Sequence, residues 1–213
     1  MSKVLYCLYD PLCGWCYGAT PAISELAGIS NLTINLLPAG LFSGDRATIV
    51  DDAFAATIWS IDQRIGRMTG QRFSDDYRLR VLGDRQQLLD SGPATLALTA
   101  VSLTTPAREL EALKDIQRAR YVNGSDVTSL ATLATLLAAL HLNEAAERIA
   151  QPDEDLLDAN LARIERAQDL MREFSARGVP TLVAESGAKR WMLNHAVGYS
   201  NPRALIDQLE TSP

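Results

Sequence analysis

Two cysteines separated by two residues, Cys13 and Cys16, are the side chains of this sequence best suited to chemistry. Thiols at this spacing can close a small ring, so the pair can cycle between a dithiol and a disulfide. Zinc sites use the same spacing, but a four-thiolate site needs a second pair, and the other cysteine is Cys7. His141 and His195 lie far away in the sequence, at no ligand spacing. The spacing therefore favours redox chemistry over a metal site.

The dithiol lies where a predicted strand ends and a predicted helix begins. Residues 3–9 are apolar and rich in strand formers, as in a strand buried on both faces, and Cys7 inside them is predicted to be buried. Asp10-Pro11 ends this strand, and a helical pattern follows the second cysteine. The unpaired N–H groups and the positive end of a helix dipole favour a thiolate there. We therefore expect an exposed Cys13 with a lowered pKa and a less accessible Cys16.

The order of the remaining elements indicates the fold class. A second strand is predicted at 32–38, which completes a right-handed β-α-β unit. Residues 45–177 show no convincing strand and carry successive helical patterns, the last over 153–177. A strand, a hairpin turn, a second strand and a helix follow. The sequence predicts an α/β thioredoxin fold with a large all-helical insertion: 1–44 and 178–213 form the thioredoxin-like domain, and 45–177 form the insertion.

Composition excludes several classes of protein. The 213 residues are 47% hydrophobic and 22% charged, which is ordinary for a globular protein. The net charge is −6 and no block of Lys and Arg stands out, so neither nucleic acid nor a membrane surface is an expected partner. No apolar run approaches the length of about 20 residues that spans a bilayer. The few cysteines, and an N-terminus that runs directly into the first strand, predict a cytoplasmic protein.

With these features in place, the chain resembles the DsbA family of thioredoxin-fold oxidoreductases, and in particular its cytosolic branch. The matching residues are 10–17, Asp-Pro-Leu-Cys-Gly-Trp-Cys-Tyr, and 177–181, Arg-Gly-Val-Pro-Thr. The resemblance implies that Cys13 is the nucleophile, that Cys16 resolves the mixed disulfide, and that Pro180 is a cis proline facing the dithiol. Many relatives carry Pro where this chain has Gly14. Since the residues between the cysteines tune the reduction potential, the direction of electron flow is not carried over.

This reading predicts a thiol–disulfide oxidoreductase that acts as a reductase, an oxidase or an isomerase on protein or peptide disulfides and dithiols. The predicted catalytic residues are Cys13 and Cys16, and the predicted substrate-binding residues are Gly14, Trp15, Val179, Pro180 and Thr181. Trp15 either packs beside the helix start or offers an apolar platform to a substrate peptide. No cofactor and no metal ion are expected. Glutathione or a thioredoxin-type protein is the expected reductant.

Two alternatives compete with this interpretation. Kappa-class glutathione transferases and 2-hydroxychromene-2-carboxylate isomerases resemble the predicted fold, including its insertion. Those enzymes generally have serine where Cys13 stands and do not keep the dithiol, so both cysteines argue against a glutathione-dependent small-molecule enzyme. The second alternative is a non-catalytic protein that binds a soft metal through Cys13 and Cys16.

Overall fold

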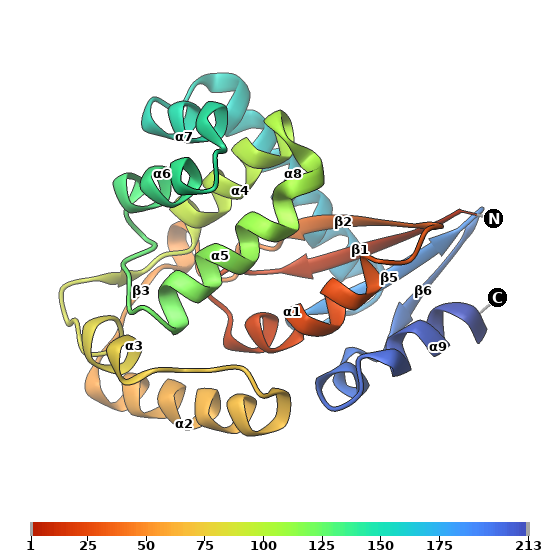
Figure 1. The fold of residues 1–213 in the computed structure, drawn as a ribbon, viewed down its shortest axis with the longest axis horizontal. Helices are drawn as coiled ribbons and strands as arrows, with labels where there is room; N and C mark the ends of the chain where they lie inside the picture. The colour runs from red at the N-terminus through yellow and green to blue at the C-terminus, as the bar shows by residue number, and fades with distance from the viewer. Residues whose placement is uncertain (1, 212–213) are drawn as a thin grey trace.

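The central sheet has the strand order β2-β1-β5-β6 in this computed structural model, which describes residues 2–211 (Figure 1). Strand β1 runs parallel to β2 and antiparallel to β5, and β6 pairs with β5 as a hairpin. The bounds are Lys3–Tyr9 for β1, Leu32–Pro38 for β2, Thr181–Ser186 for β5 and Lys189–Leu193 for β6. The central β1 is apolar because both of its faces are covered, and Leu5 and Leu8 are fully buried.

Helix α1 (Gly14–Leu26) connects β1 to the parallel strand β2, as the sequence predicted. The predicted β-β-α unit is also present, since β5 and β6 are followed by a 3₁₀ turn, η3 (His195–Tyr199), and by helix α9 (Arg203–Thr211). Both α9 and η3 pack against α1 on one side of the sheet (Figure 1). The thioredoxin fold is therefore assembled from the two ends of the chain.

The segment between β2 and β5 is mostly helical. Its helices are α2 (Asp52–Thr69), α3 (Asp75–Arg80), α4 (Gly92–Thr104), α5 (Glu109–Tyr121), α6 (Leu130–Ala139), α7 (Asn143–Ala150) and α8 (Glu154–Glu173), with 3₁₀ turns at Gly44–Arg46 and Pro106–Arg108. Helices α2 and α3 lie beside the start of α1, away from α6 and α7 (Figure 1). A small ladder of β3 (Thr48–Ile49) and β4 (Leu88–Leu89) was not predicted, because two residues are too few to show alternation.

The hydrophobic core continues from the sheet into the inserted helices. One cluster of buried residues includes Leu5 and Leu26 of the thioredoxin-like part together with Leu98 and Ile116 of the insertion. Polar contacts cross the same border: Arg163 of α8 donates to the Leu36 carbonyl at 2.8 Å, and the Thr20 hydroxyl donates to Gln117 at 2.8 Å. The predicted domain boundaries at residues 45 and 177 stay a prediction. The hydrophobic core is continuous across them.

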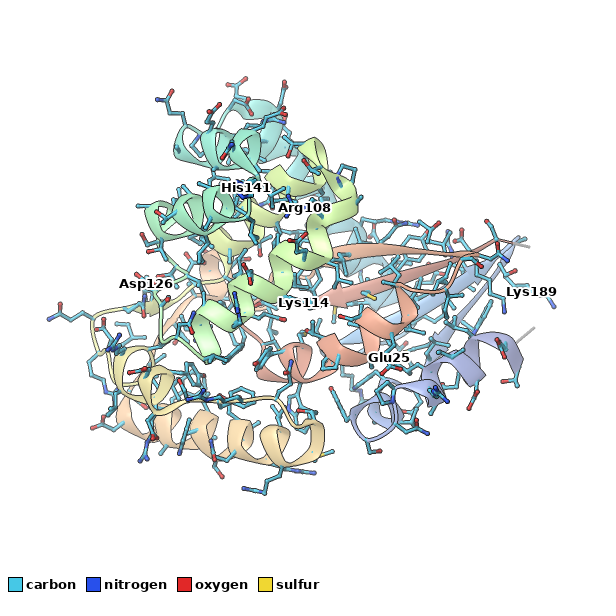
Figure 2. The ribbon with its side chains drawn as sticks, viewed as in Figure 1. Glu25, Arg108, Lys114, Asp126, His141 and Lys189 are labelled. Atoms are coloured by element: carbon cyan, nitrogen blue, oxygen red, sulfur yellow. The ribbon has the colours of Figure 1, made fainter. Side chains whose placement is uncertain are left out.

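Charged side chains cover the outer surface of the helices and of the β5–β6 hairpin (Figure 2). Exposed examples are Glu25, Lys114, Asp126 and Lys189. His141 follows α6 in a left-handed conformation with φ 58° and is exposed near Arg108, which donates to the Leu140 carbonyl at 2.9 Å. Among residues 2–211, no helix has the length and the apolar character needed to cross a bilayer.

Candidate active site

The turn between β1 and α1 places both thiols at the start of a helix. Cys13 is the N-cap residue of α1 and Cys16 lies in the first turn, as predicted. The Asp10 carboxylate accepts the Leu12 N–H at 2.9 Å, and the Cys13 N–H donates to the Asp10 carbonyl at 3.1 Å, which shapes the turn. Among the described side chains none caps α1, so the N–H groups of its first turn are available to a negative charge beside the sulfurs.

The two thiols are less accessible than expected. Cys16 is 3% exposed, as predicted, but Cys13 is only 7% exposed, so the expectation of an exposed Cys13 is wrong. The reason is the segment before β5, because the Cys13 thiol donates to the Val179 carbonyl at 3.7 Å. Burial raises the pKa of Cys16 well above its usual range, and its contact with Cys13 raises it further. Cys7 is 1% exposed, as predicted for a core residue, and burial raises its pKa to about 12.

The segment that covers Cys13 contains the predicted cis proline. The Val179–Pro180 peptide bond is cis, which confirms the expectation drawn from the resemblance. The Thr181 hydroxyl donates to the Gly178 carbonyl at 2.7 Å and so closes the turn that leads into β5. The structure thus brings together two segments that are distant in the sequence, Cys13 and the residues before β5.

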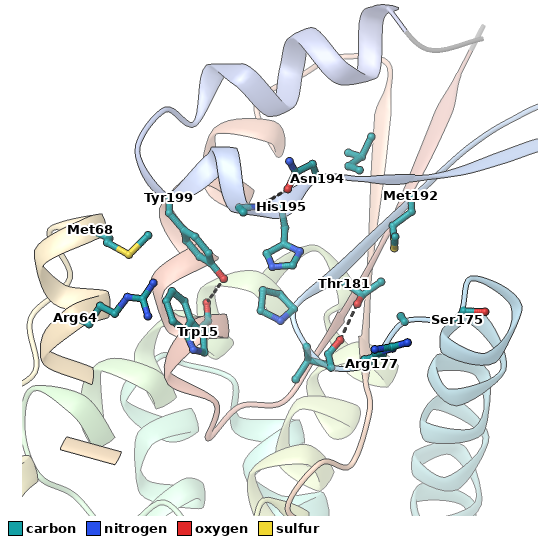
Figure 3. A pocket seen from close by; sticks show the side chains of 16 residues that line it. Trp15, Arg64, Met68, Ser175, Arg177, Thr181, Met192, Asn194, His195 and Tyr199 are labelled. Atoms are coloured by element: carbon teal, nitrogen blue, oxygen red, sulfur yellow. Dashed lines mark hydrogen bonds between the residues drawn. The ribbon is translucent and has the colours of Figure 1, made fainter. Parts of the chain in front are cut away.

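A pocket of about 780 Å³ opens beside this junction (Figure 3). Four parts of the chain line it: the start of α1, helix α2, the segment from Ser175 to Thr181, and the segment from Met192 to Tyr199. The pocket is lined by four of the predicted substrate-binding residues, Trp15, Val179, Pro180 and Thr181. The fifth, Gly14, faces α2 instead. Cys13 adjoins the pocket through its contact with Val179.

Trp15 combines the two arrangements that the sequence left open. Its ring packs 5.2 Å from the ring of Tyr199, whose hydroxyl donates to the Trp15 carbonyl at 3.4 Å. The Arg64 guanidinium lies 5.9 Å from the centre of the Trp15 ring. Trp15 is half-buried and lines the pocket at the same time (Figure 3). It therefore packs beside the helix start and presents apolar surface to a ligand.

Sequence reasoning gave no role to three further residues that line the pocket, Arg64, Arg177 and His195. Arg64 and Arg177 lie on opposite sides of it, and His195 lies between them (Figure 3). Half-burial lowers the pKa of His195, so this imidazole is neutral at neutral pH. These residues come from α2, from the segment after α8 and from η3, so no spacing in the sequence indicated that they meet. Within residues 2–211 no three His, Cys, Asp or Glu side chains are arranged to hold a metal ion.

Comparisons with known proteins place the chain in a family. Neither a scan against protein-family models nor a search of curated proteins gave a match. Among solved structures, the cytosolic disulfide reductase DsbM from Pseudomonas aeruginosa is 31% identical, with a TM-score of 0.87 over 98% of this chain and 97% of that one. The chain belongs to the DsbA-like family of thioredoxin-fold thiol–disulfide oxidoreductases.

Two further structures fit this assignment. DsbM with GSH is 31% identical and has a TM-score of 0.84 over 98% of each chain. Pseudomonas aeruginosa DsbA is 17% identical and has a TM-score of 0.55 over 98% of this chain and 83% of that one, which shows the shared fold alone. As a member of the DsbA-like family, the chain is an enzyme of thiol–disulfide exchange.

Proposed function

We propose that this DsbA-like enzyme is a cytoplasmic disulfide reductase that uses Cys13 and Cys16 on protein or peptide disulfides. The observation that carries the proposal is the position of Cys13, at the N-cap of α1 and 3.7 Å from the Val179 carbonyl at the pocket wall. Similarity to a cytosolic disulfide reductase supports both the direction of electron flow and the compartment. The chemistry requires an attacking sulfur beside the place where a substrate chain binds, and the contact of Cys13 with the pocket wall supports this role.

The reaction consists of two exchange steps. The Cys13 thiolate attacks one sulfur of the substrate disulfide; a mixed disulfide forms, and the other substrate sulfur leaves as a thiolate and takes a proton. Cys16 then loses its proton and attacks the Cys13 sulfur, which releases the second substrate thiol and leaves a Cys13–Cys16 disulfide. Two electrons pass from the dithiol to the substrate. Because burial raises the pKa of Cys16, Cys16 is protonated in the reduced enzyme and has to lose its proton before it attacks.

We infer that glutathione restores the dithiol. One glutathione thiolate attacks the Cys13–Cys16 disulfide and forms a mixed disulfide with Cys13; a second one releases glutathione disulfide and the reduced enzyme. Glutathione carries a carboxylate near each end, and the pocket has Arg64 and Arg177 on opposite sides. A relative of this chain has been solved with GSH, which supports the choice of reductant.

Replacement of each cysteine tests the dithiol mechanism. Cys16→Ala leaves the attack intact and removes the resolving thiol, so mixed disulfides through Cys13 should accumulate on a disulfide substrate and appear as adducts by mass spectrometry. Cys13→Ala should abolish both turnover and adducts. Cys7→Ala is the matched control and should keep turnover, because Cys7 lies in the core of β1. Wild-type turnover by Cys16→Ala without adducts would contradict the proposal and favour a one-thiol, glutathione-transfer mechanism.

A further inference from the structure

The residue after the first cysteine, Gly14, lies in very close contact with helix α2. A Cβ atom on Gly14 would collide with Oδ1 of Asp62 and would lie 3.2 Å from Cδ1 of Ile65. One turn later, a Cβ on Gly18 would lie 2.7 Å from Cγ2 of Ile65. Helix α1 thus turns two glycines toward α2, and the approach of the two helices brings the Asp62 carboxyl group against Gly14, the residue that follows Cys13.

Asp62 is a buried carboxyl group with few partners. It is 2% exposed, and its Oδ2 accepts the Tyr77 hydroxyl of α3 at 2.8 Å. The guanidinium of Arg120 on α5 lies 5.5 Å from the ring centre of Tyr77 and 5.7 Å from that of Tyr121. The Tyr121 hydroxyl donates to the carbonyl of Leu12, the residue before Cys13, at 2.7 Å. A network from α2, α3 and α5 therefore ends at the dithiol turn.

Burial places the ionisation of the Asp62 carboxyl group near neutral pH. Burial raises the pKa of Asp62 to about 7, against the bond from Tyr77 and the charge of Arg120, which both lower it. Tyr77 and Tyr121 are neutral in this range, because burial raises the pKa of each well above its usual value. Its own helix also carries Arg64, which lies over the Trp15 ring, and the exposed Arg67. Arg120 is the cation whose charge lowers the pKa of Asp62.

We propose that Asp62 is a positioning residue of the dithiol: held against Gly14 by α2, its carboxyl group controls how readily Cys13 becomes a thiolate. This role rests on the proposed function, in which Cys13 is the attacking thiol. A charged Asp62 repels a thiolate at Cys13 and offsets the positive start of α1, whereas a protonated Asp62 does neither. The charged form therefore disfavours the ionised dithiol and makes the pair a stronger reductant above neutral pH.

The test is the pH profile of Cys13 alkylation by iodoacetamide, followed by peptide mass analysis from about pH 5 to about pH 9. Asp62→Asn keeps an oxygen that can accept the Tyr77 bond but removes the charge. We expect this variant to react about three- to tenfold faster at neutral pH, with its profile moved to lower pH. Its dithiol–disulfide equilibrium with glutathione, measured above neutral pH, should favour the dithiol by a similar factor, and tenfold corresponds to about 30 mV.

Two further variants make the result specific. Asp52→Asn removes an exposed carboxylate from the same helix, roughly 15 Å away along its axis, and should leave the profile unchanged. Tyr77→Phe removes a bond that lowers the pKa of Asp62, so the inflection assigned to Asp62 should move to higher pH. It also tests the proposal if Asp62→Asn does not fold.

Superimposable alkylation profiles and equilibria for the wild type, Asp62→Asn and Tyr77→Phe would overturn the role of Asp62. Failure of the proposed function has a different signature, namely no adduct on the Cys16→Ala variant. The two inferences can therefore fail separately, because alkylation of Cys13 needs no disulfide substrate.

Discussion

Arg64 offers a direct test of how the pocket recognises its ligand. Arg64 is exposed on α2, lies over the Trp15 ring and faces the pocket. If it binds a carboxylate of glutathione, Arg64→Ala should raise the KM for glutathione about two- to fivefold, the range of an exposed ion pair, with little change in kcat. Steady-state kinetics at varied glutathione concentration measure this effect, which should weaken as salt is added.

Arg67→Ala is the matched control for this prediction. Arg67 is an exposed arginine one turn along the same helix and does not line the pocket. Equal KM values for the wild type and for both variants would show that α2 contributes no charge to glutathione binding.

The sequence predicted the residues of the site that belong to compact motifs. Cys13 and Cys16 were indicated by their spacing and by the helix start, and Pro180 was implied by the resemblance to the DsbA family. Asp62 and His195 were not found, because each is brought to the site by packing between elements that are remote in the sequence. The burial of Cys13 was missed for the same reason, since the covering residue, Val179, arrives from the other end of the chain.

The contact between α1 and α2 depends on the missing side chain of Gly18. In an open helix, Gly→Ala stabilises by about 1 kcal/mol, but here a Cβ would lie 2.7 Å from Cγ2 of Ile65. Overpacking of this kind costs about 1–3 kcal/mol and outweighs that gain, so we expect Gly18→Ala to lower the free energy of unfolding by up to about 2 kcal/mol. Urea denaturation followed by circular dichroism measures the change.

A double-mutant cycle separates this contact from other effects. In an Ile65→Ala background the methyl group at position 18 has room, so Gly18→Ala should cost less there, or should stabilise. Gly178→Ala is the control for stability, since a Cβ there meets nothing within 4 Å. An equal cost of Gly18→Ala in both backgrounds would contradict the close contact with Ile65.

At the level of elements, periodicity predicted most of the secondary structure. The apolar strand β1, the helix after the dithiol and the helices of the insertion all follow patterns that a single segment displays. Periodicity does not predict which other element a helix packs against. Gly14 and Gly18 have helical spacing in the sequence, but only the structure shows that α2 packs against them, because their role depends on the shape of another segment.

The hydrophobic core is shared between the thioredoxin-like part and the insertion. Two clusters of buried residues each combine the sheet with the insertion, and Arg163 joins α8 to β2 through the Leu36 carbonyl. We expect the two parts to unfold together. Single-tryptophan variants that retain either Trp59 of α2 or Trp191 of β6 should show the same urea midpoint and the same m value by fluorescence.

Two separate transitions would contradict this prediction and would support an insertion that folds by itself.

The order of elements predicted the thioredoxin fold and the position of the insertion, since both follow from counting strands and helices. That the core continues across the border could not be predicted, because every amphipathic helix shows an apolar face and the sequence does not state what covers it.

The crowding of Gly14 by α2 also limits how this enzyme can evolve. Relatives with proline after the first cysteine need space for a ring where this chain has the Asp62 carboxyl group. A proline at position 14 therefore requires that the Asp62 side chain turns aside, that residue 62 becomes smaller, or that α2 shifts outward. Across homologues, the two positions should change as a pair. We therefore expect the residue at position 14 to depend on the packing of α2 as well as on the reduction potential that the dithiol requires.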